Sequence, residues 1–197
     1  MANEYADLGT AKLQLGLDDA NDTRDVLLQQ ALTAASRSID RATGRRFWLD
    51  GTVVQRVYRP QGRTVIEDDG TVLIVDDIGD TTGLLVETGS GSSWSAVTHW
   101  EAVPDNALAL GRPITGLLRL GGWVYGLNRV RVTAKFGWPA VPDEIVQATL
   151  IQANRLFKRK DSPEGVTGSA EWGVVRLSRR DPDVWNLIEP YVLPGFG

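Results

Sequence analysis

The sequence predicts an α+β protein in which N-terminal helices and one long helix near the C-terminus form a helical core. An antiparallel β-domain, either a sandwich or a small barrel, is inserted between these helices, and an extended C-terminal arm follows them. The first observation is the stretch 129–136, where polar and apolar side chains alternate as on a strand with one buried face. The second is the stretch 142–160, where apolar residues recur at helical spacing.

These patterns divide the chain into four parts: an N-terminal helical part at 1–46, a β-rich insertion at 47–141, the long core helix at 142–160 and the arm with a short helix at 161–197. A Gly-Trp-Pro corner precedes the long helix, and we expect Pro142 at its first position, where the missing N–H is not needed. So much of this helix is apolar that we expect its own domain or a neighbouring subunit to cover more than one side.

The composition is that of a globular protein without cysteine chemistry. The chain has 197 residues, of which 42% are hydrophobic, a formal net charge of -4 and no cysteine. Disulfides and thiol catalysis are therefore excluded, and a reducing cytoplasm suits its synthesis. No run approaches the length of a membrane span, no signal peptide is indicated, and no segment has the basic excess needed to grip a phosphate backbone.

The N-terminal part is expected to contain two helices. The first covers 4–15 and ends at Gly16, and the second covers 22–43, with Asp22 as its N-cap and Gly44 at its end. The second helix has an apolar stripe of the kind that packs against another helix. The stripe consists of Leu28, Leu32, Ala35, Ile39 and Ala42.

The central region is expected to contain seven or eight short antiparallel strands. Four β-type runs, at 53–58, 64–67, 71–75 and 84–88, are separated by turn-forming residues. Asp69-Gly70 is the strongest hairpin signal, because a type I′ turn needs positive φ at both central residues.

The C-terminal arm is expected to leave the body of the protein. A turn at 161–165 ends the long helix, 166–177 suits a hairpin or an arm, and 181–183 caps a short final helix. Since such an arm has few local partners, we expect truncation after Lys160 to weaken assembly but leave the fold intact.

The sequence contains few candidate catalytic residues. His99 is the single histidine and has no serine or cysteine motif around it. The acidic clusters at 67–69 and 76–80 could be imagined as paired carboxylates or a calcium loop, but hairpin turns explain both more simply. We expect no enzyme activity, no metal and no cofactor.

Seven tryptophans are many for this length and suggest one alternative function. On a β-domain, indole rings can stack on sugars, so a carbohydrate-binding or other ligand-binding module without catalysis is the alternative. Its sugar face would lie among Trp94, Trp100 and Trp123. Core packing and subunit interfaces use tryptophan at least as readily.

Three stretches, taken in order, carry a family resemblance. They are the helical opening at 5–47, the strand and corner at 132–142 that run into the long helix, and the segment 159–165 with the trailing 181–184 and Pro190-Tyr191. Together they resemble the head-to-tail connector, or adaptor, proteins of long-tailed (siphovirus-type) bacteriophages.

The resemblance implies a structural virion protein without a reaction. Such adaptors form a ring, usually of twelve copies, at the neck below the portal protein, with a stopper or tail-side neck protein below. DNA passes through the ring without sequence-specific binding, and the subunits are made in the cytoplasm of the bacterial host. The candidate oligomer or partner contacts are Leu28, Leu32, Ile39, Val146, Leu150, Phe157, Trp172, Arg179, Arg180, Trp185 and Tyr191.

Overall fold

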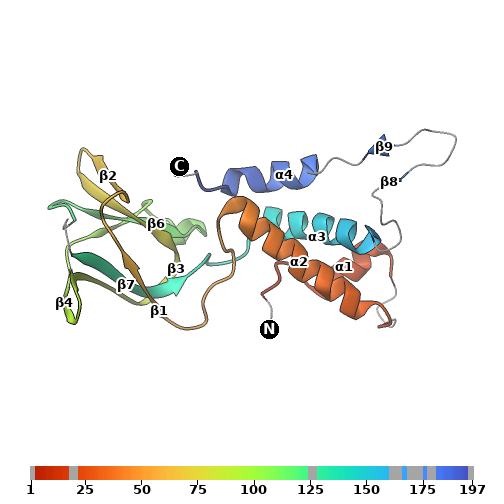
Figure 1. Ribbon diagram of the computed structural model, residues 1–197, viewed down its shortest axis with the longest axis horizontal. Helices are drawn as coiled ribbons and strands as arrows, with labels where there is room; N and C mark the ends of the chain where they lie inside the picture. The colour runs from red at the N-terminus through yellow and green to blue at the C-terminus, as the bar shows by residue number, and fades with distance from the viewer. Residues whose placement is uncertain are drawn as a thin grey trace. The chain divides into compact units, whose positions relative to one another are not determined.

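The computed structural model describes residues 3–17, 22–123, 128–159 and 181–194, and the backbone at 166–167 and 175–176 (Figure 1). The chain forms two compact units. Unit 1 combines Met1–Arg45 with Val141–Gly197, and unit 2 is the continuous stretch Arg46–Ala140. The α+β class predicted from the sequence is confirmed, since the α-helices lie in unit 1 and a seven-stranded antiparallel sheet lies in unit 2.

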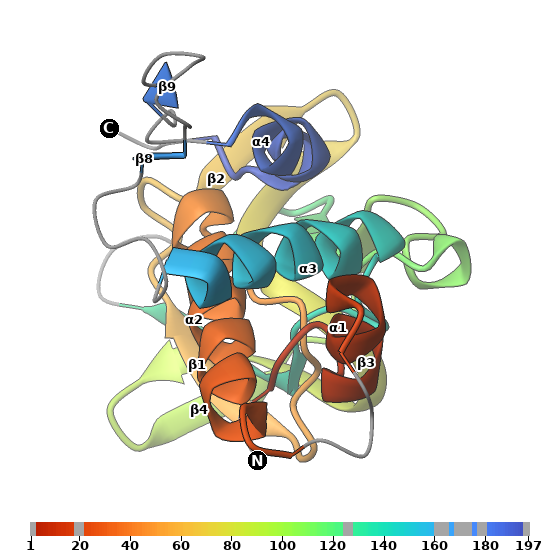
Figure 2. The ribbon, with the colours of Figure 1, turned by 90° about the vertical axis from the view of Figure 1, so that its right-hand side faces the viewer.

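Unit 1 contains α1 (Leu8–Leu15), α2 (Asp25–Thr43), α3 (Asp143–Lys158), α4 (Pro182–Ile188) and the 3-10 turn η3 (Glu189–Tyr191). Helix α1 contacts both α2 and α3 (Figure 2). Gly16 and Gly44 end their helices in the left-handed conformation, as expected. The strands β8 (Val166–Thr167) and β9 (Val175–Arg176) pair with each other.

Three expected helix starts are wrong in detail. The first helix begins at Leu8 rather than at residue 4, with Asp7 as its N-cap. Asp22 does not cap α2; its carbonyl accepts the N–H of Asp25 at 3.0 Å, so a turn precedes the helix. The Asp25 side chain instead forms an ion pair with buried Lys12 of α1 at 2.8 Å. Pro142 is the N-cap of α3 rather than its first residue, and its backbone is extended.

The core of unit 1 lies between α1, α2 and α3. Leu28, Leu32, Leu150 and Phe157 are buried there among small alanines, which let the helix backbones approach each other. A hydroxyl is tolerated inside because Ser36 donates to the Leu32 carbonyl at 2.9 Å.

The C-terminal segment returns to unit 1, which contradicts the expectation that it has few local partners. Asp181 caps α4 as predicted, and its carboxylate also pairs with Arg155 of α3 at 3.0 Å. Val184 and Ile188 are buried, and the N–H of Leu193 donates to the carbonyl of Thr43 at 2.8 Å. This segment is therefore part of the unit, although nothing in its proline-rich sequence indicated where it packs.

The sheet of unit 2 has the order β1-β7-β3-β6-β5, with β2 and β4 also paired to β3. The strands are β1 (Val54–Tyr58), β2 (Thr64–Glu67), β3 (Gly70–Ser90), β4 (Ser93–Ala96), β5 (Glu101–Val103), β6 (Ile114–Arg119) and β7 (Arg129–Phe136), and the 3-10 turn η1 (Leu108–Leu110) lies between β5 and β6. β7 has the predicted bounds, and its residues alternate between half-buried and buried. The described strands of unit 2 belong to one sheet rather than two, which does not support the sandwich alternative.

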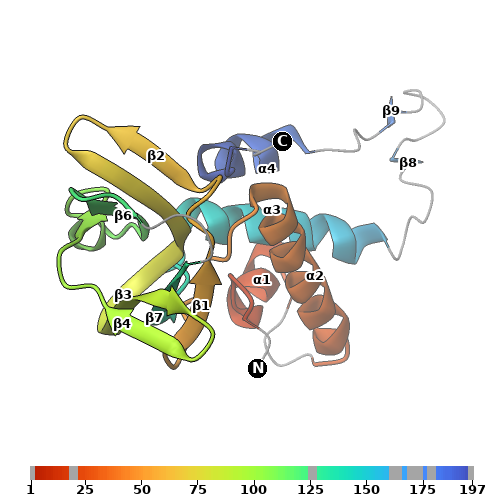
Figure 3. The ribbon, with the colours of Figure 1, turned by 60° about the vertical axis from the view of Figure 1, so that its left-hand side comes forward.

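The long strand β3 lies in the middle of the unit 2 sheet and pairs with most of the other strands (Figure 3). It differs from what the sequence predicted. The runs at 71–75 and 84–88 are not separate strands but the two halves of β3. The first half pairs with β2 and β6, and the second half pairs with β7 and β4. The register shifts between these halves, so the strand can change partners along its length.

The acidic cluster at 76–80 is not a hairpin turn but the irregular middle of β3. Each carboxylate has a partner there. Asp76 pairs with Arg56 at 2.7 Å, Asp77 accepts from the Trp138 indole at 3.0 Å, and Asp80 pairs with Lys135 at 2.9 Å. These partners come from distant parts of the chain, so the local sequence could not distinguish this cluster from a turn.

The cluster at 67–69 does lie in a hairpin, but the turn is not type I′. Glu67 pairs with Gly70 across the two strands, so Asp68 and Asp69 form the loop. Among the described residues, Asn106 is the one non-glycine residue with positive φ, so Asp69 lacks the conformation that a type I′ turn requires.

The ion pair of Asp80 leads to a prediction about acid stability. Lys135 and then the Thr82 N–H, which donates at 2.8 Å, lower the pKa of Asp80 from 3.8 to about 2. A lowered pKa contributes stability that is present above the unfolded pKa of 3.8 and is lost as the pH falls towards 2. We expect Asp80→Asn to flatten this part of the pH dependence of unfolding, measured by tryptophan fluorescence. Asp105→Asn, at an exposed position of the same unit, is the control, and equal slopes in both variants would contradict the assignment.

Candidate interaction surfaces

The single histidine and the acidic residues of the described part of the chain do not form a metal site. His99 is exposed, and no group of three or more His, Cys, Asp or Glu side chains in the described ranges could hold a metal ion. Among the helices that the structure describes, none is both long and apolar enough to cross a membrane.

The predicted contact residues fall into three groups. Leu28, Leu32, Ile39, Leu150 and Phe157 are buried inside unit 1, where their side chains pack within the chain. Val146, Trp185 and Tyr191 are half-buried and keep accessible area. Trp172, Arg179 and Arg180 lie outside the described residues. Contacts between subunits stay a prediction for all of them, and the first group has little free surface to offer.

A matched pair of substitutions tests the role of the buried group. Leu32 is fully buried on α2, whereas Leu13 on α1 is 80% exposed. We expect Leu32→Ala to lower the free energy of unfolding of unit 1 by about 3 kcal/mol, and Leu13→Ala by under about 0.5 kcal/mol. Far-UV circular dichroism reports unit 1, because the α-helices that the structure describes belong to it. Equal losses in the two variants would contradict the burial of Leu32 in the chain's own core.

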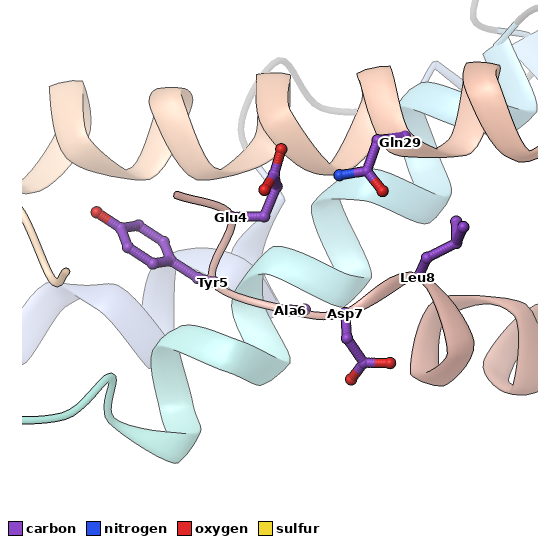
Figure 4. A pocket seen from close by; sticks show the side chains of 6 residues that line it. All are labelled: Glu4, Tyr5, Ala6, Asp7, Leu8 and Gln29. Atoms are coloured by element: carbon purple, nitrogen blue, oxygen red, sulfur yellow. The ribbon is translucent and has the colours of Figure 1, made fainter. Parts of the chain in front are cut away.

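The first hollow on the surface lies between the N-terminal segment and α2. Figure 4 shows it, with Glu4 on the segment facing Gln29 on the helix. The hollow has a volume of about 400 Å³ and also borders Asp7. Thr33 donates to Glu4 at 2.7 Å, and Thr10 donates its N–H to Asp7 at 2.8 Å.

The carboxylates of this hollow are already satisfied. Burial opposes ionisation of Glu4, but the bonds from Thr33 and other donors outweigh it, so the pKa of Glu4 is lowered. The Thr10 hydroxyl and N–H lower the pKa of Asp7. Tyr5 between them is buried, with its N–H bonded to Ser36 at 3.1 Å and its hydroxyl bonded to Asp40. This hollow is thus the place where the N-terminal segment is fixed to α2, and both of its carboxylates accept hydrogen bonds from within the chain.

The second hollow lies in unit 2 and is strongly basic. It has a volume of about 590 Å³ and lies where β1 passes through a loop into β2, opposite the middle of β3. Arg56, Arg59 and Arg63 surround it with a single carboxylate, Asp76, so two positive charges are in surplus. The sequence analysis missed this hollow, although three arginines at 56, 59 and 63 were a usable signal.

Fixed contacts shape the floor of the second hollow. Arg56 bonds Asp76 at 2.7 Å and lies over the ring of Phe136 at 4.0 Å. The Tyr58 hydroxyl donates to Asp76 at 3.1 Å, and burial together with the charge of Asp76 raises the pKa of Tyr58 well above its usual value. Arg63 is looser, at 3.8 Å from Asp76. Arg59 is exposed and has no ion-pair partner among the described residues.

The three tryptophans proposed for sugar binding do not form an exposed face. Trp123 is 2% exposed, and its indole N–H donates to the carbonyl of Leu117 at 3.0 Å inside the core. Arg131 lies over the ring of Trp94 at 4.3 Å, and Trp100 packs against the core cluster. The geometry therefore gives the carbohydrate-binding alternative no support.

The fold and surfaces define a class of protein: an α+β chain with a helical unit and a curled-sheet unit, without a recognisable catalytic centre in its described part. No family model matches the chain, and no curated protein matches it. Solved structures share the fold, among them these two. One is a chain in the neck of an empty GTA particle computed with C6 symmetry, 18% identical, covering 100% of this chain and 98% of that chain with a TM-score of 0.56. The other is in the virion of a native gene transfer agent (GTA) particle, 20% identical, covering 99% and 97% with a TM-score of 0.50.

Proposed function

We propose that this chain is a structural component of the neck of a phage-like particle, where its copies form a ring that joins the head to the tail. The observation that carries the proposal is the full-length likeness to a chain from the neck of a GTA particle, which leaves almost no part of either chain unmatched. The motifs at both ends of the sequence point independently to the same class.

In this proposal the ring has twelve copies, below a portal protein and above a stopper or tail-side neck protein. The C6 symmetry of the similar neck suits a copy number that is a multiple of six. DNA passes through the ring without sequence-specific contacts. The net charge of -4 fits this role, because a mildly acidic lumen does not hold a phosphate backbone.

The half-buried residues of unit 1 are proposed as contacts in the assembled neck. Trp185 on α4 and Val146 on α3 keep accessible apolar area, and Tyr191 donates its hydroxyl to Glu144 at 2.9 Å near the surface. Tryptophan and tyrosine are enriched where proteins meet, because each combines a large apolar body with a polar group.

The test is the mass of the purified protein over a range of concentrations, with and without portal protein, followed by negative-stain images of the largest species. Rings of about a dozen subunits would support the proposal. A monomer at every concentration that ignores portal protein would overturn it.

A further inference from the structure

Unit 2 carries two surfaces of opposite charge that are not in contact within the chain. The first is the second hollow described above, the arginine hollow, formed by Arg56, Arg59, Arg63 and Asp76 with the rings and chains beneath them. The second is the acidic tip, which consists of Glu67, Asp68 and Asp69 at the end of the β2–β3 hairpin. The two surfaces lie at opposite ends of that hairpin.

The acidic tip is uncompensated. All three carboxylate residues are exposed, and none has an ion-pair partner among the described residues. The apolar residue beside them, Ile66, is 81% exposed, although it is on a strand. The tip therefore offers three carboxylates and one apolar side chain to a partner whose surface is basic and partly apolar.

The arginine hollow offers the complementary set. Arg59 is unpaired and Arg63 only loosely paired, so both guanidinium groups can bind a further carboxylate in bidentate fashion. Val57 at its rim is 55% exposed and supplies an apolar contact of the kind that Ile66 needs. The hollow thus matches the tip in charge and in apolar character.

Within one chain the two surfaces are not in contact. Pairing with β3 holds β2 extended, so Arg63, just before β2, and Glu67, at its end, are about 13 Å apart along the chain. Among the described residues the carboxylate that pairs with Arg63 is Asp76, on the side of the hollow, and not a residue of the tip. A partner for the tip is therefore sought on another copy.

We propose that the acidic tip of one copy docks in the arginine hollow of the next copy. Because two different patches meet, the contact is head-to-tail, which is the kind that repeats around a ring. The inference rests on the ring described under Proposed function and names a surface that holds it together. Since the contact is ionic, raising the salt concentration should weaken assembly.

Cysteine pairs provide the sharpest test, because the chain has no cysteine of its own. A disulfide requires Cα atoms within about 7 Å, so Arg59→Cys with Asp68→Cys can only link different copies. Under mild oxidation we expect a ladder of covalent multimers that reductant dissolves. The matched control is Arg112→Cys with Asp68→Cys, because Arg112 is an exposed arginine of the same unit outside the hollow. Equal ladders in both variants, or none in either while the protein assembles, would overturn the inference.

Charge reversal provides the second test. We expect Arg59→Glu with Arg63→Glu, and separately Asp68→Lys with Asp69→Lys, to raise the concentration needed for assembly at least about tenfold. Tryptophan fluorescence checks that unit 2 of each variant is folded, because Trp123 and Trp138 are buried there. An equimolar mixture of the two variants should assemble again, since each restores an attractive contact to the other.

The outcomes separate the inference from the function on which it rests. If the wild-type protein forms rings and both charge-reversed variants form the same rings at the same concentrations, the contact is wrong but the proposed ring remains. A wild-type protein that never assembles, even with portal protein, would overturn both. Duplex DNA is titrated in parallel, and a loss of DNA binding in the arginine variant with normal assembly would assign the hollow to phosphate and overturn the inference.

Discussion

Gly137→Ala is expected to unfold unit 2 or to lower its free energy of unfolding by about 4 kcal/mol or more. Gly137 follows β7 with φ at +116, which is outside the conformations that an L-residue readily adopts. A Cβ at this position would also overlap the carbonyl oxygen of Trp48. Because this oxygen is a backbone atom, it cannot move away by a side-chain rotation. Conformational strain and a backbone collision therefore act together.

Relieving the collision would cost much free energy, because hydrogen bonds and packing fix both backbone segments, the one around Gly137 and the one around Trp48. The N–H of Gly137 donates to the carbonyl of Asp77 at 2.8 Å, and the N–H of Asp50 donates to the carbonyl of Phe136 at 2.9 Å. The neighbouring Trp138 is buried and packs on Phe47, with ring centroids 5.2 Å apart. Moving either backbone would break these contacts.

Gly91→Ala is the matched control for this prediction. Gly91 also has positive φ, at +58, but a Cβ there has nothing within 4 Å. We expect it to cost only about 1 kcal/mol, the usual penalty of the backbone conformation alone. Urea unfolding followed by tryptophan fluorescence measures both variants, and equal losses would show that the collision at Gly137 is absent.

The strand β7 and the helices were predictable because their residues repeat at the period of the element. Arg129–Phe136 alternates over its whole length, and the stripes of α2 and α3 follow helical spacing. Such signals depend only on near neighbours in the chain. The bounds of these elements were therefore correct to within a few residues.

The errors occurred where partners distant in sequence decide the structure. The middle of β3 resembles a turn locally, but Arg56, Lys135 and Trp138 bind its carboxylates and keep it in the sheet. In the same way, no local pattern shows that Leu193 meets Thr43.

The interaction surfaces were harder to predict than the elements. Apolar residues at helical spacing, such as Leu28 and Leu150, occur both in hydrophobic cores and in subunit contacts. In this structure Leu28 and Leu150 are buried within the chain. The arginine hollow depends on β1, β2 and β3 coming together. The sequence shows the three arginines but not the unpaired state of Arg59.

Truncation after Lys160 is expected to destabilise unit 1, in contrast to what the sequence alone suggested. The shortened chain loses α4, whose residues Val184 and Ile188 are 8% and 3% exposed. Burying each side chain contributes about 1.5 to 3 kcal/mol, so we expect a loss of about 3 to 6 kcal/mol in the free energy of unfolding of the helices. The bond of Arg45 to the carbonyl of Tyr191, at 2.8 Å, and the pair of Arg155 with Asp181 are lost as well.

A double substitution separates packing from chain length in this prediction. Val184→Ala with Ile188→Ala keeps every residue of the C-terminal segment but removes its buried side chains, and we expect it to reproduce most of the loss seen by circular dichroism. The control is Asp183→Ala with Asn186→Ala, at two exposed positions of the same helix, which should change stability by under about 1 kcal/mol. If the truncated chain instead unfolds like the full chain, α4 is not part of the core of unit 1, and residues 161–197 act as the arm that the sequence suggested. The same truncated protein then becomes the right material for asking whether the arm is needed for assembly.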